Sequence, residues 1–288
     1  MQANVYFVIL HYQTINETTE CVESIINNIK YKNKHIIIVD NASPNKSGLY
    51  LKDYYKNYEN IEVIINSKNL GFAKGNNVGY AHAKEMGAEY IVQVNSDTIF
   101  KDEFFITELI KIHKEKGYAV LGPKIISLED GGLQNPLKNG VKSVRDIKRK
   151  IIELKIKLLL SYLNLDKLII NFLKKNNNNN SSIMDKEYID ITEDIDVLLH
   201  GCCFIFSSDY INEFEGMFDK TFMYYEEHIL YYNCNKKGLK MLYTNKIQLF
   251  HKRKASTKEV YAKEINRRRF TYKESIKSLV AFKNYLKQ

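Results

Sequence analysis

Cysteine is scarce in this chain of 288 residues, which has four: Cys21, Cys202, Cys203 and Cys234. They form neither a C-x-x-C pair nor the spacing of a zinc finger, and two adjacent cysteines make poor disulfide partners. We therefore expect four free thiols in a reducing cytoplasm.

Long apolar runs are also missing. No stretch reaches the roughly 18 uncharged apolar residues of a membrane-spanning helix. The start, MQANVYFVILHYQTINET, enters a strand-like run at once and has no basic segment or cleavage site of a secretion signal. We expect a cytoplasmic protein whose membrane contact, if any, is peripheral, on the inner face of the cytoplasmic membrane.

Basic residues are abundant, giving a formal net charge of +9, and 44% of the residues are hydrophobic. This composition supports one substantial core and favours anionic partners such as phosphate-bearing substrates or anionic lipid. Basic and aromatic residues mix near the C-terminus, in Lys252–Lys254 and Arg267–Arg269. No nucleic-acid-binding motif accompanies them, so we expect no nucleic acid partner.

The first 125 residues alternate short β-branched or aromatic runs with longer helical patterns, which predicts an α/β fold whose mostly parallel, Rossmann-like sheet has helices on both faces. The predicted strands are Val5–Leu10, His35–Val39, Ile61–Ile65, Tyr90–Val94 and Tyr118–Gly122. The predicted helices are Glu17–Ile29, Gly71–Met86 and Glu103–Lys116.

Residues 138–185 break this rhythm. Apolar residues recur there at helical steps of three and four, at Ile147, Ile151, Leu154, Leu158, Tyr162, Leu165, Ile169 and Phe172, among many Lys and Arg. The pattern predicts a basic amphipathic helical insert that ends in the polar tract 176–182. Either the apolar stripe of residues 141–175 lies on an anionic membrane, or it packs on the protein's own core or on a second subunit in a homodimer.

The C-terminal part is compact again. Strands are predicted at Val197–Phe206, Leu239–Tyr243 and Ile247–Phe250, with a helix at Tyr225–Lys236. We divide the chain into a first half (1–137), the basic insert and linker (138–185), a second half (186–257) and a basic C-terminal helix (258–288).

Polar residues follow the predicted strands where parallel sheets bind ligands, at their carboxyl ends. These are His11-Tyr12, Asp40-Asn41 and Asn95-Ser96-Asp97. Asp97 follows a strand that appears buried, where a carboxylate needs hydrogen bonds or a cation. Residues of this kind also serve as helix N-caps.

Two further sites carry chemistry. Glu226 and Glu227 begin a predicted helix among aromatic residues, including Tyr224 and Tyr225, as expected of a sugar-binding cleft with acids beside flat apolar surfaces. His251 closes a short strand. Together with Asp97 it would supply an oxygen and a nitrogen ligand to Mg²⁺ or Mn²⁺.

Seven segments in one order resemble family 2 glycosyltransferases of the GT-A fold, nearest to the rhamnosyl- and galactosyl-type enzymes of bacterial polysaccharide assembly. They are VILHYQT, IIIVDNAS, NLGFAKGNNVGY, VNSDT, HGCCFIF, GMFDKTFMYYEEHIL and the final FH. The resemblance covers about residues 4–127 and 196–257 and skips the basic insert. It implies that the first half (1–137) binds the nucleotide sugar and that the second half (186–257) binds the acceptor and carries the catalysis. The reaction implied is a metal-dependent, inverting transfer from a UDP- or dTDP-sugar to a lipid-linked or polysaccharide acceptor of a capsule or cell-surface glycan.

The resemblance also implies roles for individual residues. Asp40 would bind the nucleobase, with Asn41 and Ser43 shaping the turn, and Asn69, Gly71 and Asn76 would lie along the donor. Asp97 matches the last acid of the family's DxD metal motif, whose first position is Asn95 here, and His251 matches the late metal-binding histidine. Glu227 would be the general base with Glu226 beside it, and Gly201 and Cys202 match the strand that lines the acceptor side. Where the family often has a further acid, this chain has Ile229.

Two other functions are compatible with an α/β fold of this kind. A sugar nucleotidyltransferase shares the α/β layout but needs a Gly-rich basic loop after the first strand, where this chain has HYQTINET. A non-catalytic binding protein of the same fold would have lost its acids or its histidine. Asp97, Glu227 and His251 are all present.

Overall fold

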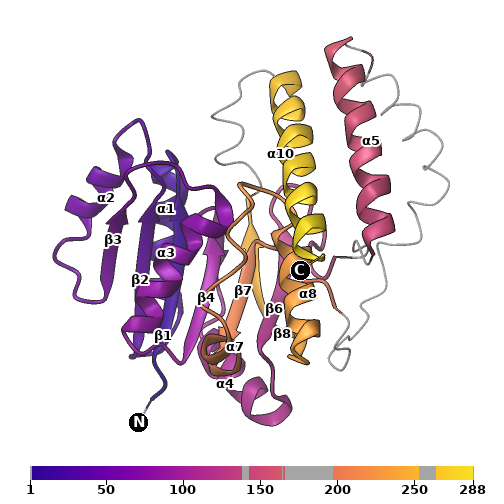
Figure 1. The fold of residues 1–288 in the computed structure, drawn as a ribbon. Helices are drawn as coiled ribbons and strands as arrows, with labels where there is room; N and C mark the ends of the chain where they lie inside the picture. The colour runs from indigo at the N-terminus through magenta and orange to yellow at the C-terminus, as the bar shows by residue number, and fades with distance from the viewer. Residues whose placement is uncertain (1, 138–142, 164, 166–196, 253–263, 288) are drawn as a thin grey trace.

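A single eight-stranded sheet, in the order β3-β2-β1-β4-β7-β6-β8-β5, organises the chain (Figure 1). The computed structural model describes residues 2–137, 143–163, 165, 197–252 and 264–287. Strands from both predicted halves, 1–137 and 186–257, enter this one sheet. The division into halves therefore stays a prediction about function.

The first four strands of the order are parallel. They are β1 (Val5–His11), β2 (Lys34–Asp40), β3 (Ile61–Ile65) and β4 (Tyr90–Asn95). In register, Leu10 of β1 lies opposite both Val39 of β2 and Asn95 of β4. The polar residues that follow these strands therefore meet at one edge of the sheet, as predicted.

The rest of the sheet is mixed. It contains β5 (Thr98–Phe100), β6 (Val120–Ser127), β7 (Cys203–Ser207) and β8 (Met241–His251). β7 runs antiparallel between β4 and β6, and β8 is one strand where we expected two. The pairing of β6 with β8 shifts register beside Pro123, which has no N–H to donate. The polar residues 244–246 fall at this shift, which explains why the sequence suggested two strands.

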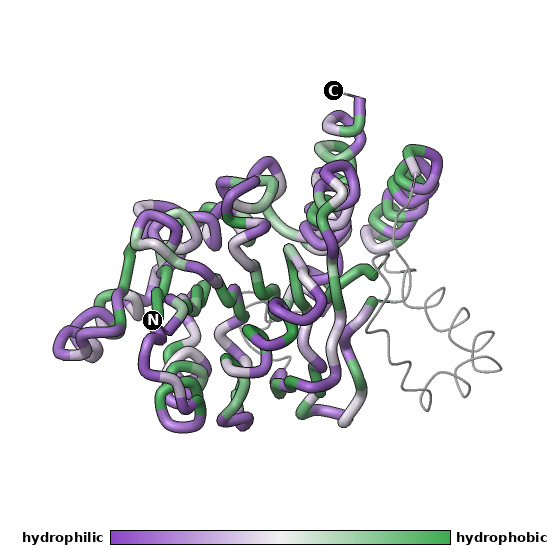
Figure 2. The backbone as a smooth tube through the Cα atoms, turned by 90° about the horizontal axis from the view of Figure 1, so that it is seen from below, coloured by the Kyte–Doolittle hydropathy of each residue, from purple (hydrophilic) through white to green (hydrophobic). Residues whose placement is uncertain are grey.

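Helices cover both faces of the sheet, as predicted. On one face, α1 (Ile15–Asn28), α2 (Ser47–Tyr54) and α4 (Phe105–Lys116) supply buried apolar side chains; on the other, α3 (Phe72–Glu85), α7 (Ser208–Glu213) and α8 (Glu226–Lys236) do so. Figure 2 shows hydrophobic segments in the interior and coils of alternating hydropathy at the periphery. The sequence did not predict α2, α7 and β5, because each has only three to eight residues.

A third cluster joins α5 (Val144–Tyr162) to α10 (Glu264–Tyr285) and α8. Figure 1 shows α5 and α10 side by side, projecting beyond the upper edge of the sheet. Ser143 caps α5 by accepting the N–H of Asp146 at 3.1 Å. Arg269 of α10 donates to the carbonyl of Ser161 at 2.6 Å and stacks on Tyr162. This basic residue therefore holds two helices together.

The apolar stripe predicted for a membrane is divided. Its first residues, Ile147, Ile151 and Leu154, are buried within the third cluster. For these three residues the alternative prediction is therefore confirmed: they pack within the chain and do not face a membrane. Residues 166–182, with the later part of the stripe and the polar tract, lie outside the described residues. Within the described ranges, no helix combines the length and the apolarity needed to cross a bilayer.

Candidate functional site

The loops after β1 and β2 form a compact polar network around Asp40. The carboxylate of Asp40 is almost fully buried and accepts the hydroxyl of Ser43 at 2.5 Å and its N–H at 3.2 Å. A Cβ on Gly48 would lie 2.3 Å from the carboxyl carbon, so α2 approaches Asp40 closely. Ser43 shapes the turn as predicted, and contact of Asp40 with a nucleobase stays a prediction.

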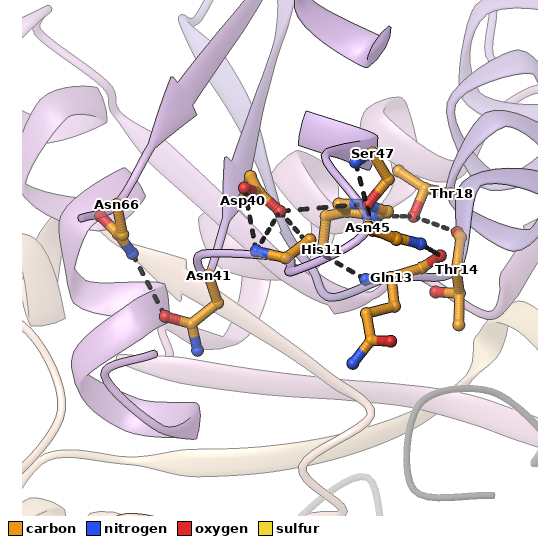
Figure 3. Close-up of polar contacts among 10 residues, drawn as sticks. His11, Gln13, Thr14, Thr18, Asp40, Asn41, Asn45, Ser47 and Asn66 are labelled. Carbon is orange, nitrogen blue, oxygen red and sulfur yellow. Dashed lines mark hydrogen bonds and ion pairs between the residues drawn. The ribbon is translucent and has the colours of Figure 1, made fainter. Parts of the chain in front are cut away.

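His11 lies at the centre of this network (Figure 3) and is completely enclosed. Its Nδ1 is 2.7 Å from the hydroxyl of Thr18, and its Nε2 is 2.7 Å from that of Ser47. Burial lowers the pKa of His11 to about 4 although the charge of Asp40, 3.9 Å away, favours protonation. The ring is therefore neutral at pH 7. Because the ring is enclosed, we correct the predicted donor contact: His11 positions the loops that carry Asp40.

Asn41 joins the end of β2 to the loop before α3. Its amide donates to Asn69 Oδ1 and to the carbonyl of Gly71, each at 3.0 Å, and its Oδ1 accepts the N–H of Leu70 at 2.9 Å. Figure 3 also shows the bond from Asn66 to Asn41. Asn41 is buried, so it shapes the turn, as predicted. Asn69 is exposed, so its side chain is accessible to a ligand.

Gly71 has a φ of 82°, and a Cβ there would lie 2.3 Å from the carbonyl oxygen of Phe222. The close approach observed is therefore between two parts of the chain, and Phe72 donates its N–H to the same oxygen at 2.7 Å. Asn76 is buried on α3, where its amide donates to the carbonyl of Phe72 and its Oδ1 has no hydrogen-bond partner. Tyr12 is partly exposed. Donor contacts of these residues stay predictions.

Backbone strain gathers at the same edge. Among the described residues, five non-glycine residues have positive φ: Gln13, Ala42, Lys46, Tyr224 and Tyr225. The first three lie in the loops that follow β1 and β2, and the other two directly precede Glu226. Such conformations are unfavourable for side chains with a Cβ and persist where packing enforces them, often at functional sites.

Asp97 and His251 come together although 154 residues separate them. β5 pairs with β8 so that Thr98 lies opposite His251, and Asp97 accepts the N–H of Lys252 through its carbonyl at 2.9 Å. The distance from His251 Nε2 to Asp97 Oδ1 is 3.1 Å, and both side chains are about one-tenth exposed. The two residues that the sequence assigned to one metal ion therefore lie side by side, and the metal itself stays a prediction.

The donor atoms of the pair suit a divalent cation. Gln134 Oε1 is 2.7 Å from His251 Nδ1; because a carbonyl oxygen only accepts, the proton lies on Nδ1. The lone pair of Nε2 then faces the carboxylate, and two acceptors 3.1 Å apart need a proton or a cation between them. Among the described residues, no third Asp, Glu, His or Cys completes a metal cluster. A metal here would need oxygen ligands from a bound substrate or water.

Glu226 and Glu227 begin α8, as predicted. Glu226 is buried and accepts the hydroxyl of Thr221 at 3.1 Å. Glu227 is partly exposed, and its carboxylate accepts the backbone N–H of Gly201. A Cβ on Gly201 would lie 2.7 Å from Glu227 Oε1, so only glycine leaves room for this contact. The sequence did not predict this contact, and the acceptor-side role expected of Gly201 stays a prediction.

The two acids differ in ionisation. Burial raises the pKa of both, and the negative charge of Glu227 raises that of Glu226 further, to about 8. Because the charge of Glu227 is one cause of the raised pKa of Glu226, Glu227 is the first of the two to release its proton. Glu227, whose carboxylate can accept a proton, thus lies beside Glu226, which keeps its proton up to a pH of about 8.

The remaining acceptor-side predictions are settled only in part. The side chain of Cys202 is buried in the core, so it cannot contact a ligand, and the acceptor-side role expected of this residue stays a prediction for its backbone. Its carbonyl accepts the N–H of Asn95 at 2.9 Å. Tyr224 lies 3.1 Å from the Thr271 hydroxyl, and the ring of Tyr225 contacts that of His228. All four cysteines are free and buried, as predicted.

Several supporting residues were missed: Thr18 and Ser47 around His11, Gln134 behind His251, and Thr221 beside Glu226. Only Thr221, five residues before Glu226, lies close enough in sequence to have been suspected. Pairing partners such as Gln134, 117 residues from His251, depend on the fold.

Comparison with known proteins identifies the family. The model of "Glycosyl transferase family 2" matches residues 6–210. The chain belongs to glycosyl transferase family 2. This confirms the resemblance to the family, and the matched residues end before Glu226, Glu227 and His251.

Relatives within the family come from bacteria. The chain is 28% identical over 145 residues to the dTDP-rhamnosyl transferase RfbF of Shigella flexneri. The aligned segment makes up 49% of this chain and 46% of that protein. It is 31% identical over 111 residues to the glycosyltransferase GlyG of Streptococcus pneumoniae serotype 4, covering 38% and 36%. The chain thus spans under half the length of these relatives.

The fold agrees as well. The crystal structure of Staphylococcus aureus TarS residues 1–349 in complex with UDP-GlcNAc matches with a TM-score of 0.54 at 13% identity, over 88% of this chain and 59% of that one. At this identity the likeness establishes the fold. The family 2 chain therefore has the predicted α/β architecture, a GT-A-like fold with a mixed, mostly parallel sheet.

Replacing Glu226 by Gln tests the ionisation of the pair. Between its ordinary pKa of 4.5 and the folded value of about 8, Glu226 holds a proton that the unfolded chain has released. The free energy of unfolding of the wild type should therefore fall with rising pH across this window. Glu226→Gln, which cannot ionise, should gain stability relative to the wild type from pH 5 to 8, measured by urea denaturation.

Glu85→Gln is the matched control, because Glu85 is exposed. Its stability should keep a constant offset from the wild type at every pH. Parallel curves for Glu226→Gln and the wild type would contradict a proton held by Glu226.

Proposed function

We propose that this chain is an inverting, metal-dependent glycosyltransferase that transfers a sugar from a UDP- or dTDP-sugar to a lipid-linked or polysaccharide acceptor in bacterial surface glycan synthesis. One observation carries the proposal: the backbone of Gly201-Cys202 contacts both chemical centres. Gly201 donates to the Glu227 carboxylate, and Cys202 accepts from Asn95, two residues before Asp97. A base and a diphosphate-binding acid on neighbouring elements are what the transfer requires.

The donor side rests on the loops after β1 and β2. Asp40, Asn41 and Asn69 lie at the carboxyl ends of parallel strands, where α/β sheets bind nucleotides. The dTDP-sugar of RfbF and the UDP-GlcNAc bound by TarS make both nucleotides candidates for this chain. We assign the nucleobase to Asp40 and the donor backbone to the loop around Asn69.

The base is Glu227. An inverting transfer needs a carboxylate that takes the proton of the acceptor hydroxyl as it attacks the anomeric carbon, while the bond to the diphosphate breaks. Glu227 ionises before Glu226 and is partly exposed, so it can meet a substrate. Glu226 is buried and supports the start of α8 through Thr221. It therefore positions Glu227.

Asp97 and His251 would hold Mn²⁺ or Mg²⁺. Such an ion, when bound, stabilises negative charge that develops on the departing diphosphate. Asn95, at the first position of the motif, is partly exposed beside the pair and is a weaker ligand than a carboxylate. Gln134 keeps the His251 ring in the tautomer that leaves Nε2 available.

The alternative functions have less support. A sugar nucleotidyltransferase is disfavoured because the loop after β1 is occupied by the His11 network and has no glycine. A non-catalytic binding protein has no need of two adjacent acids whose pKa values are both raised. The proposed location is the cytoplasm, peripheral to the inner face of the membrane, and a homodimer is the alternative use of the α5 surface.

Glu227→Gln should lower turnover by at least roughly 100-fold, the usual contribution of a general base, while donor affinity is kept. Glutamine retains an oxygen that can accept the Gly201 N–H, so the loop should stay in place. The measurement is release of nucleoside diphosphate together with calorimetric donor binding. Glu226→Gln should be less harmful; the reverse order would make Glu226 the base.

The metal site is tested by calorimetry of UDP and dTDP binding with and without Mn²⁺. We expect Mn²⁺ to tighten binding of the preferred nucleotide, and Asp97→Ala to reduce that gain by at least about tenfold. Asp53→Ala, at an exposed carboxylate of α2, is the control and should behave as the wild type. Equal affinities in both conditions would overturn the metal assignment.

A further inference from the structure

His200 opens the segment HGCCFIF and has no role in the proposed function. It directly precedes Gly201, whose N–H contacts the Glu227 carboxylate. Its ring lies edge-on to the ring of His251, with 6.1 Å between the centroids and 64° between the planes. The side chain is partly exposed, so a ligand can reach it. His200 therefore adjoins both the proposed base and the pair of Asp97 and His251.

The backbone decides which ring nitrogen of His200 carries the proton. The N–H of Cys202 donates to His200 Nδ1 at 3.0 Å. Because a backbone N–H only donates, Nδ1 is the acceptor and the ring proton lies on Nε2. His251 has the opposite arrangement, with its proton on Nδ1 and its lone pair on Nε2. The two neighbouring rings therefore offer one lone pair, which suits a cation, and one N–H, which suits an anion.

Two consecutive residues hold these two histidines. Gln134 Oε1 is 2.7 Å from His251 Nδ1, and Asn135 Oδ1 accepts the backbone N–H of His200 at 3.0 Å. Asn135 is buried, and its amide donates to the carbonyl of Pro123 at 2.7 Å. One short segment thus contacts both histidines, which favours a fixed spacing between the two rings before a ligand binds.

The other groups assigned to this part of the site are acceptors. Asp97 and Glu227 are acids, and His251 presents the lone pair of Nε2. A bound diphosphate adds negative oxygen atoms, of which one divalent cation contacts only some. A hydrogen-bond donor beside the acids offsets part of the repulsion between them and the diphosphate. The Nε2–H of His200 is a donor of this kind.

We propose that His200 is a further catalytic residue, whose Nε2–H donates a hydrogen bond to the terminal phosphate of the bound nucleoside diphosphate. This inference rests on the proposed function. When the bond from the anomeric carbon to that phosphate breaks, its electrons stay on the phosphate oxygen, and the added charge strengthens the hydrogen bond. His200 keeps its proton throughout. It does not ligate the cation, because Nε2 carries the proton and Nδ1 accepts from Cys202.

The alternative is that His200 only supports the turn at Cys202, and two substitutions separate the roles. His200→Asn keeps an oxygen near the position of Nδ1, where it can accept the Cys202 N–H as Asn does in turns, but has no group at the position of Nε2. His200→Gln keeps an N–H near the position of Nε2 and loses the nearer acceptor. If His200 is a donor, Asn is the more harmful substitution; if it only supports the turn, Gln is.

The test is calorimetric binding of UDP and dTDP to the full chain with Mn²⁺, with UMP and dTMP as comparisons. His200→Asn should weaken binding of the preferred diphosphate by roughly tenfold or more, as for a lost hydrogen bond to a charged group, and leave the matching monophosphate unchanged. His200→Gln should recover most of that loss. In EDTA the same factor should separate His200→Asn from the wild type, because the contact does not pass through the cation.

His82→Asn is the matched control, because His82 lies in the last turn of α3 and pairs with the exposed Glu62. It should bind every nucleotide as the wild type does. The comparison of monophosphate with diphosphate within one variant is independent of any loss of stability, which would affect both alike. Equal losses for the two, a larger loss in His200→Gln than in His200→Asn, or a loss that disappears in EDTA would overturn the proposal.

Donor hydrolysis separates this proposal from the proposed function. If the wild type hydrolyses a nucleotide sugar but His200→Asn binds the diphosphate as tightly as the wild type, the assignment of His200 alone fails. If the His200 variants behave as expected and no nucleotide sugar is hydrolysed, the chain binds nucleoside diphosphates through His200 and the proposed function fails.

Discussion

The contacts made by the backbone at Gly201-Cys202 are the constraint on which the site depends. This segment precedes β7, the strand that joins the parallel and antiparallel parts of the sheet. On one side it donates to Glu227, and on the other it accepts from Asn95 at the end of β4. A Cβ on Gly201 would lie 2.7 Å from Glu227 Oε1, so any larger residue would displace the carboxylate from this contact. The backbone of this segment thus links the proposed base, Glu227, to the end of β4, next to the proposed donor site.

The surrounding loops store unfavourable conformations that the packed sheet enforces. Positive φ at Tyr224 and Tyr225 turns the chain directly into α8, so that both acids lie in its first turn. There the N-terminal dipole of the helix favours negative charge, whereas burial and mutual repulsion disfavour it. The result is a raised pKa for both acids, and with a pKa of about 8 Glu226 keeps its proton near neutral pH.

The sequence predicted most of the architecture because strand and helix periodicities were clear. Strands β1 to β4 and helices α1, α3 and α4 were within one or two residues of their observed bounds. Asp97 and His251 were placed together because both follow β-like runs. The role of His11 was mispredicted, since enclosure by Thr18 and Ser47 depends on how α1 and α2 pack. Likewise, periodicity showed that α5 has an apolar face but could not show that α10 covers it.

The account depends on a nucleotide-sugar donor bound at the carboxyl edge of the sheet, with Glu227 facing it. The most direct measurement is incubation of the purified full chain with a panel of UDP- and dTDP-sugars and Mn²⁺, followed by quantification of released nucleoside diphosphate. The account predicts release from at least one donor, stimulated by the metal. No release from any donor, together with no binding of UDP or dTDP, would contradict it.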